Sequence, residues 1–222
     1  MKNKEIIHVY LMPGMAASSK IFEFIKLPEN EFKIHLLEWI TPLEKESINA
    51  YAFRISKVIK HENIVLLGVS FGGVLVQEIS KYVTVKKLII VSSIKTMKEL
   101  PKTMVMAKKT RVYKLIPTKL AKNISSLSKY VSSRRVVRRL DLYDKYLSVN
   151  DERYLDWAIK NMVTWNQQSY NPNIIHIHGD NDAVFPIKNI SNCLTIKNGT
   201  HIMIIDKYKW FNQNLPKIIL EN

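Results

Sequence analysis

Ser70 is the residue of this chain with the clearest potential for covalent chemistry. It lies in the segment Gly68-Val-Ser70-Phe-Gly72-Gly73, between an apolar run over 64–69 and a run with helical spacing over 71–79. A sharp turn from a strand into a helix strains the serine backbone, and the flanking positions must then lack side chains that would collide with both elements. Three of the six glycines stand at these positions. The pattern predicts an exposed serine nucleophile; a tight turn with a capping serine is the alternative.

A serine hydroxyl is a weak nucleophile near neutral pH and needs a general base, which a third group orients. His201 is the candidate base, because it follows a Gly-x turn after the last apolar run and precedes an apolar helix. The other histidines fall in strand patterns or beside a helix end. The loop after the apolar run 174–178 offers two carboxylates, Asp180 and Asp182. Serine, acid and histidine therefore follow one another in the order typical of one large hydrolase class.

The elements that must position these residues alternate between strands and helices. Short apolar runs typical of buried parallel strands are expected at 6–12, 32–39, 64–69, 87–92, 174–178 and 193–196. Helical patterns are expected at 41–60, where Thr41 precedes a proline and early acids, at 71–79 and at 202–215. We therefore predict an α/β fold with a mainly parallel central sheet and helices on both faces. Loops at the carboxyl ends of such strands gather ligands, which would bring the candidate residues together.

Taken together, the three segments resemble the α/β-hydrolase superfamily from about residue 6 to the end, apart from an insertion. The resemblance implies a compact carboxylesterase-like member with Ser70, Asp182 and His201 as its catalytic triad. The acid of this family commonly ends a Gly-x-x-Asp segment, which selects Asp182 and leaves Asp180 to cap the turn. Some members place the acid after the preceding strand, but Ser92-Ser-Ile94 carries no carboxylate there. The implied activity is hydrolysis of a carboxylic ester through an acyl-enzyme.

The resemblance also implies two backbone donors for the oxyanion. One is the N–H of Phe71, directly after the nucleophile, and the other is the N–H of Met15, in the loop after the first strand. Pro13 replaces the histidine of the family's His-Gly-x segment, which keeps the backbone donor but removes one anchor of its loop. The chain has no Gly-Gly-Gly loop, which argues against the lipase and esterase branch that uses one.

Residues 95–165 show no strand pattern, only helical spacing interrupted by prolines and serines. We expect a helical cap insertion within a single domain over 1–222, at the place where the family puts the cap that sets substrate choice. Its apolar side chains could line an acyl pocket, although packing of helix faces explains them equally well: Met104, Met106, Leu115, Ile116, Leu127, Tyr130, Met162 and Trp165.

The positive charge is concentrated in this insertion. The chain carries a net charge of +15, and residues 95–140 hold fourteen lysines and arginines against one acid, Glu99. On a helix, one group of arginines would form a cationic strip that attracts an acidic carrier protein, an anionic lipid surface or nucleic acid: Arg134, Arg135, Arg138 and Arg139. A solvated basic face is the alternative. Nucleic acid is the least favoured partner, because no recognised binding module accompanies the strip.

Several classes of function are disfavoured. The chain has no apolar run of about 20 residues that could span a bilayer and no secretory signal pattern, and its single cysteine, Cys193, cannot form an internal disulfide. We therefore expect a cytoplasmic protein. His176 and His178 alternate on one strand face, but no further ligand accompanies them, so neither a metal nor a cofactor is expected.

Other functions remain open beside the ester hydrolase. A thioesterase or amidase, including one that acts on acyl chains linked to a carrier protein, would use the same residues, and a lyase can share the fold. A protein of the same fold without catalytic activity could instead hold an acidic partner through the basic insertion.

Overall fold

The computed structural model describes residues 5–115, 118 and 145–221. Six strands form one sheet in the order β2-β1-β3-β4-β5-β6, and all five neighbouring pairs are parallel. The strands are β1 (Ile7–Met12), β2 (Phe32–Leu36), β3 (Ile64–Val69), β4 (Lys87–Val91), β5 (Ile174–Gly179) and β6 (Leu194–Ile196). All six predicted strands are present, which confirms the α/β prediction. The second ends three residues earlier than expected.

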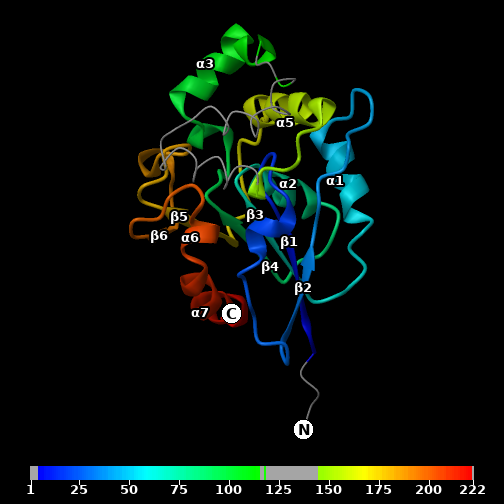
Figure 1. Ribbon diagram of the computed structural model, residues 1–222, viewed down its shortest axis with the longest axis vertical. Helices are drawn as coiled ribbons and strands as arrows, with labels where there is room; N and C mark the ends of the chain where they lie inside the picture. Colours follow the sequence, from blue (N-terminus) through cyan, green and yellow to red (C-terminus); the bar gives the residue numbers. More distant parts are fainter. Residues whose placement is uncertain (1–4, 116–117, 119–144, 222) are drawn as a thin grey trace.

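Helices lie on both faces of the sheet (Figure 1). The α-helices are α1 (Ile48–Ser56), α2 (Phe71–Ile79), α3 (Lys102–Thr110), α5 (Glu152–Thr164), α6 (Met203–Asp206) and α7 (Tyr208–Leu220). Short 3₁₀ turns add η1 (Ser19–Phe22), η2 (Met97–Glu99), η3 (Val112–Leu115) and η6 (Ile187–Asn189). None of the described helices is both long and apolar enough to cross a membrane.

The helix predicted to open at Thr41 begins seven residues later, so this prediction was wrong. Ser47 caps α1, and its hydroxyl oxygen accepts a hydrogen bond from the N–H of Ala50 at 3.2 Å. The preceding acid, Glu46, is held outside the helix, because its carboxylate pairs with Arg54 at 2.7 Å and its carbonyl oxygen accepts the indole N–H of Trp157 at 2.8 Å. Thr41 and Ser47 are both suitable capping residues, and the contacts of Glu46 favour Ser47.

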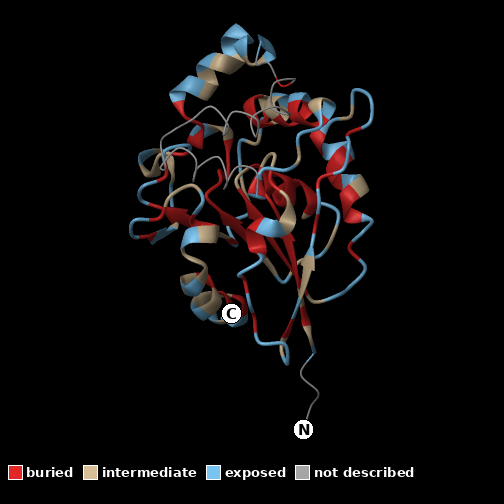
Figure 2. Cartoon of the chain, viewed as in Figure 1, coloured by how far each residue is buried: buried red, intermediate tan, exposed pale blue. Residues whose placement is uncertain are grey.

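Alternate residues of each strand face two separate hydrophobic cores. On β3, Leu66 packs in the core beneath α1, α2 and α5, whereas Leu67 packs in the core beneath η1, α6 and α7. Figure 2 shows the buried residues concentrated in the sheet and in α2. Every residue of α2 is buried, which is the burial expected of a helix enclosed between the sheet and other helices.

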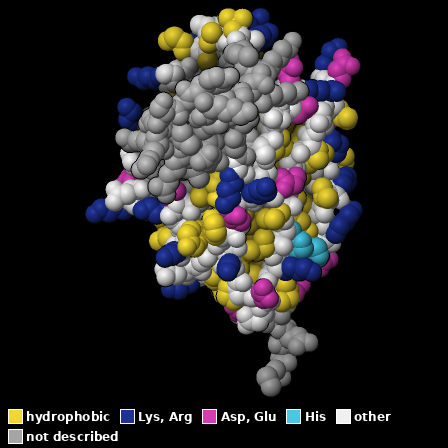
Figure 3. Space-filling model, in the orientation of Figure 1, with side chains coloured by type: hydrophobic (Ala, Val, Ile, Leu, Met, Phe, Trp, Pro, Cys, Tyr) yellow, Lys and Arg dark blue, Asp and Glu magenta, His cyan; other side chains and the backbone are white. Residues whose placement is uncertain are grey.

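The described part of 95–165 contains helices and no strand, and it lies at the carboxyl edge of the sheet (Figure 1). Helix α5 buries Tyr154 and Trp157 in the same core as α1 and α2. On the face seen in Figure 3, lysines and arginines of the described residues are spread widely over the surface. Lys95, which the charge count assigned to the basic segment, is instead buried beside Glu99, with 3.5 Å between Nζ and Oε1.

Candidate active site

Ser70 occupies the turn between β3 and α2, where its backbone is strained. Its φ and ψ are 53° and −121°, a region that non-glycine residues avoid at a cost of about 1–3 kcal/mol. Two hydrogen bonds hold the peptide groups in place: its N–H donates to the carbonyl of Val91 at 2.9 Å, and its carbonyl accepts the hydroxyl of Ser93 at 2.6 Å. The neighbouring strand β4 therefore maintains the turn that projects the serine.

The three glycines around Ser70 are required by close contact with neighbouring backbone and, at Gly73, with the side chain of Ser93. A Cβ atom at Gly68 would collide with the carbonyl group of Gly72. One at Gly72 would lie 2.6 Å from the carbonyl oxygen of Met12, and one at Gly73 would lie 2.6 Å from the Cβ of Ser93. These contacts pack the turn against β1 and β4, as the sequence pattern predicts for a nucleophile elbow.

Ser70, His201 and Asp182 form one hydrogen-bonded row. The Oγ of Ser70 lies 3.0 Å from Nε2 of His201, and Nδ1 of His201 lies 2.9 and 3.1 Å from the two carboxylate oxygens of Asp182. The three residues come from separate loops at the carboxyl ends of β3, β5 and β6. When Nδ1 carries its proton toward the carboxylate, Nε2 is free to accept the serine proton, which is the arrangement that activates a hydroxyl nucleophile.

Asp182, rather than Asp180, lies against His201. Its side chain is buried, and Oδ1 accepts backbone N–H groups from Val184 at 2.8 Å and Phe185 at 2.9 Å, whereas Asp180 is exposed. Burial alone would raise the pKa of Asp182, but the hydrogen bonds and charge of His201 and the two N–H donors outweigh it, and the pKa lies below its ordinary 3.8. The carboxylate is therefore ionised at neutral pH and can stabilise an imidazolium.

Two more histidines lie behind this carboxylate. Nε2 of His178 lies 3.6 Å from Oδ2 of Asp182 and donates to the carbonyl of Phe185 at 2.8 Å. This fixes Nδ1 of His178 as an acceptor for Nε2 of His176 at 3.1 Å. Burial lowers the pKa of both rings, that of His176 to about 2. Both are neutral at pH 7, so they support the Asp182 loop and do not compete with His201 for charge.

The acid and histidine loops are joined by direct backbone contact. A Cβ atom at Gly179, the last residue of β5, would collide with the carbonyl of Gly199, and one at Gly199 would lie 2.9 Å from the Cα of Gly179. The N–H of Asn181 also donates to the carbonyl of Gly199 at 3.0 Å. The relative positions of Asp182 and His201 are therefore fixed by contacts that any larger residue would disrupt.

The loop predicted to carry the second oxyanion donor lies beside the serine. A Cβ atom at Gly14 would be 3.3 Å from the Cβ of Ser70 and 4.0 Å from its Oγ. Among the described residues, no acceptor binds the N–H of Met15 or the N–H of Phe71, the first residue of α2. An unoccupied N–H group at each position is what the predicted oxyanion role requires.

Two aromatic residues that the sequence did not single out hold this loop. The indole Nε1 of Trp39 donates to the carbonyl of Gly14 at 2.8 Å, and its ring stacks on Phe71 with 5.3 Å between centroids. The hydroxyl of Tyr154 on α5 accepts the N–H of Ala16 at 3.2 Å. These two bonds anchor the loop that follows Pro13. Their only sequence signal was an aromatic residue in an apolar stretch, which equally indicates core.

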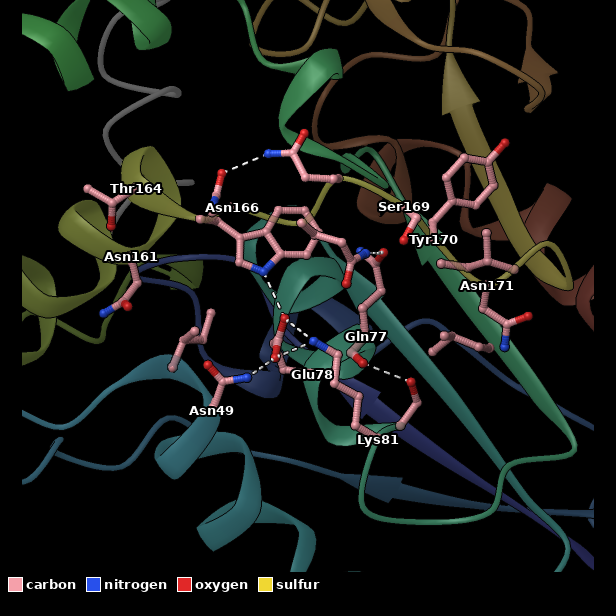
Figure 4. Close-up of a pocket in the computed structure, with 17 residues that line it drawn as sticks. Asn49, Gln77, Glu78, Lys81, Asn161, Thr164, Asn166, Ser169, Tyr170 and Asn171 are labelled. Carbon is pink, nitrogen blue, oxygen red and sulfur yellow. Dashed lines mark hydrogen bonds and ion pairs between the residues drawn. The ribbon is translucent and has the colours of Figure 1, made fainter.

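A cavity in the described part of the chain is separate from this site. It measures about 770 Å³ and lies between α1, α2 and the segment that follows α5, and none of its lining residues belongs to the row of Ser70 (Figure 4). Glu78 at its floor is buried and already bound by the side chains of Trp165, Asn49 and Lys81, at 2.9, 2.6 and 2.7 Å. The carboxylate of Glu78 is therefore already paired with side chains around the cavity.

The proposed pocket residues of the insertion do not act as one group. Met162 and Trp165 are buried in the core, so helix packing explains them. Met106 and Leu115, in contrast, are 63% and 79% exposed. Met104 is partly buried against the core. Ile116, Leu127 and Tyr130 lie outside the described residues, and so do the four arginines of the predicted strip, Arg134, Arg135, Arg138 and Arg139.

Comparisons with known proteins rest on structure alone, since no protein-family model and no curated protein sequence matches the chain. It is similar to an esterase from Exiguobacterium antarcticum (TM-score 0.66, 17% identity, 99% of this chain and 93% of the other). It is also similar to a bromoperoxidase from Bacillus anthracis (0.65, 18%, 99% and 94%) and to the type II thioesterase BorB from the borrelidin biosynthetic cluster (0.57, 12%, 96% and 91%). At these identities the likeness concerns fold, and it confirms the expected architecture. The chain therefore has the fold of the α/β-hydrolase superfamily.

Proposed function

We propose that the protein is a serine hydrolase that cleaves carboxylic esters through an acyl-enzyme on Ser70. The observation that carries this proposal is the row of hydrogen bonds from the Ser70 hydroxyl through both ring nitrogens of His201 to the Asp182 carboxylate, at 3.0 and 2.9 Å. A serine strained at a strand-to-helix turn is oriented toward its base before any substrate arrives.

In the first half of the reaction, Ser70 Oγ attacks the acyl carbonyl while His201 Nε2 accepts the hydroxyl proton. Asp182 holds the resulting imidazolium through Nδ1, and the N–H groups of Met15 and Phe71 bind the oxyanion. His201 then donates its proton to the leaving alcohol, and the acyl group remains on Ser70. A water molecule, deprotonated by His201, releases the acid in the second half.

The same residues would cleave a thioester, and the structural likeness to a type II thioesterase supports keeping that activity as the second candidate. In both cases the substrate is an acyl group whose identity depends on the surroundings of Ser70, including the insertion 95–165, which we propose to be a cap within a single domain. An acidic partner for the insertion stays a prediction, and so does a cytoplasmic location, which rests on the single cysteine, Cys193.

The test of the nucleophile is labelling with a fluorophosphonate probe, which reacts with activated serines. The wild-type protein should be labelled and Ser70→Ala should not. Ser80→Ala is the matched control, because Ser80 ends the same helix and donates to the carbonyl of Gln77, away from His201. Labelling that persists in Ser70→Ala would refute the assignment. Absence of labelling and of turnover in the wild type would favour the binding protein without activity.

Substrate class is then determined by turnover of p-nitrophenyl esters and of acyl thioesters of graded chain length, each measured with and without an acidic carrier protein. An ester hydrolase should prefer the oxygen esters at equal chain length. A carrier-linked enzyme should instead show a KM that falls when the acyl group is presented on the carrier and rises again with salt.

A further inference from the structure

Three histidines that are distant in sequence meet at the surface, at a place unrelated to the candidate active site. They are His8 on β1, His35 on β2 and His61 in the turn between α1 and β3. One ring nitrogen of each lies within 4.8 Å of the others, and within the described residues no other group of three such side chains has this spacing. His8 and His35 are half-buried and His61 is exposed, and Figure 3 shows histidine side chains reaching the surface on this face.

The sheet places these side chains together. Tyr10 on β1 pairs with His35 on β2, and residues that pair in parallel strands point to the same face. His8 lies two residues before Tyr10 and therefore shares that face, which carries α1. The ring of His61 then stacks on that of His8, with centroids 3.7 Å apart and planes within 11°.

The nitrogen atoms lie close enough together to bind one transition-metal ion once the ring of His61 rotates out of its stack on His8. Nδ1 of His8 and Nε2 of His35 are 2.9 Å apart, and two nitrogens that bind one tetrahedral Zn²⁺ at about 2.0–2.1 Å stand about 3.3 Å apart. Nδ1 of His61 is bonded to the hydroxyl of Tyr10 at 2.6 Å, so His61 would bind an ion through Nε2. A partner on the second nitrogen is the usual device that orients a metal-binding histidine.

We propose that His8, His35 and His61 form a binding site for one divalent transition-metal ion, with Zn²⁺ as its expected occupant and Tyr10 as the residue that orients His61. Three imidazoles without a carboxylate favour Zn²⁺, Cu²⁺ or Ni²⁺ over Mg²⁺ and Ca²⁺, which prefer oxygen ligands. Three protein ligands leave the fourth position to water.

The site would connect parts of the chain that the sheet alone holds weakly. β2 is an edge strand, and the ion would join it to β1 and to the turn before β3. His8 stands four residues before the end of β1, so the site lies roughly 13 Å from the carboxyl edge, where Ser70 is found. An ion that binds only the folded chain stabilises it, so the expected role is structural and separate from catalysis.

The experiment is calorimetric titration of the full-length chain, without an affinity tag and freed of metal by a chelator, with ZnCl₂. One equivalent should bind, Co²⁺ should give the visible absorption of a tetrahedral site, and Zn²⁺ but not Mg²⁺ should raise the melting temperature. Failure of the wild type to bind Zn²⁺ more tightly than Mg²⁺ would overturn the proposal.

Variants assign the ligands. His61→Asn, at an exposed position, should weaken binding by more than tenfold and abolish the Co²⁺ absorption, and Tyr10→Phe should weaken binding by about tenfold. His201→Asn is the matched control and should bind Zn²⁺ as the wild type does. Binding lost in His201→Asn but kept in His61→Asn would place the ion in the row of Ser70 and refute this site. His35→Asn, with its fold checked by circular dichroism, supplies a second ligand test.

Discussion

The indole N–H of Trp39 donates a hydrogen bond to the carbonyl of Gly14, at 2.8 Å, and both groups are within the core of the protein beside the candidate oxyanion site. The same indole stacks on Phe71. Trp39 thus contacts the residue before Met15 and the side chain of Phe71, whose two N–H groups are the candidate donors. One aromatic side chain sets the distance between two loops that come from different strands.

Trp39→Phe should therefore lower kcat while changing KM little. Phenylalanine keeps a ring against Phe71 but loses the bond to Gly14, so the Met15 donor is held less well. We expect kcat to fall about tenfold, less than the 10²–10³ that loss of a whole donor costs. Turnover of p-nitrophenyl acetate measures the effect. Trp157→Phe is the matched control, because it removes an indole bond of equal length, to the carbonyl of Glu46, and should leave kcat unchanged.

Asp182→Asn should lower kcat by about 10⁴, because the amide would donate to Nδ1 of His201 and fix the tautomer that cannot accept the serine proton. Asp180→Asn provides the comparison, since Asp180 is exposed two residues away. Steady-state turnover and fluorophosphonate labelling rate should decline together in the first variant and stay at the wild-type level in the second. Equal activity of the two variants would rule out Asp182 as the orienting acid.

His176 should make stability fall as the pH drops below 6.5. Burial, with His178 and Lys95 nearby, lowers its pKa from the ordinary 6.5 to about 2, so between these values only the unfolded chain binds a proton there. The free energy of unfolding then decreases by up to about 1.4 kcal/mol per pH unit for this ring. Urea unfolding between pH 5 and 6.5 should give a smaller slope for His176→Gln than for the wild type. Identical slopes would show that the ring is protonated in the folded protein.

Lys95→Met should destabilise the fold by about 3–5 kcal/mol, because it leaves a buried carboxylate without its cation. Nζ of Lys95 lies 3.5 Å from Glu99 and also binds the carbonyls of Ser191 and Asn192. Lys98→Met, at an exposed position three residues later, should change the unfolding free energy by less than about 0.5 kcal/mol. Urea titration compares the two, and a double variant with Glu99→Met should recover part of the loss.

The row of Ser70, Asp182 and His201 could be located from sequence because each part carries a local signal. Small residues around a serine, and loops that directly follow apolar runs, do not depend on distant parts of the chain. The structure adds what local patterns cannot contain, namely the 3.0 Å contact between Ser70 and His201, which are 131 residues apart, and the 2.9 Å contact between His201 and Asp182, which are 19 residues apart. The choice between Asp180 and Asp182 needed the family resemblance, because both acids follow the same strand.

Other features depend on contacts that no short window of sequence reveals. The start of α1 was misplaced because Arg54 and Trp157 bind Glu46 and leave Ser47 as the cap. In the sequence, Trp39 and Tyr154 are aromatic residues in apolar stretches, a pattern that ordinary core residues share. His8 and His35 were assigned to separate strands, and only the pairing of β1 with β2 brings them together. Packing between elements, rather than propensity within them, decides these cases.

All six glycines of the chain lie around Ser70, Asp182 and His201, and none of them has a positive φ; at five of them, 68, 72, 73, 179 and 199, a Cβ atom would lie less than 3.0 Å from a neighbouring atom. A side chain at any of these five positions would therefore have to displace a neighbouring backbone segment, the Ser93 side chain or the Met203 side chain. We therefore expect distant relatives to keep the intervals between the glycines at 68, 72, 73, 179 and 199.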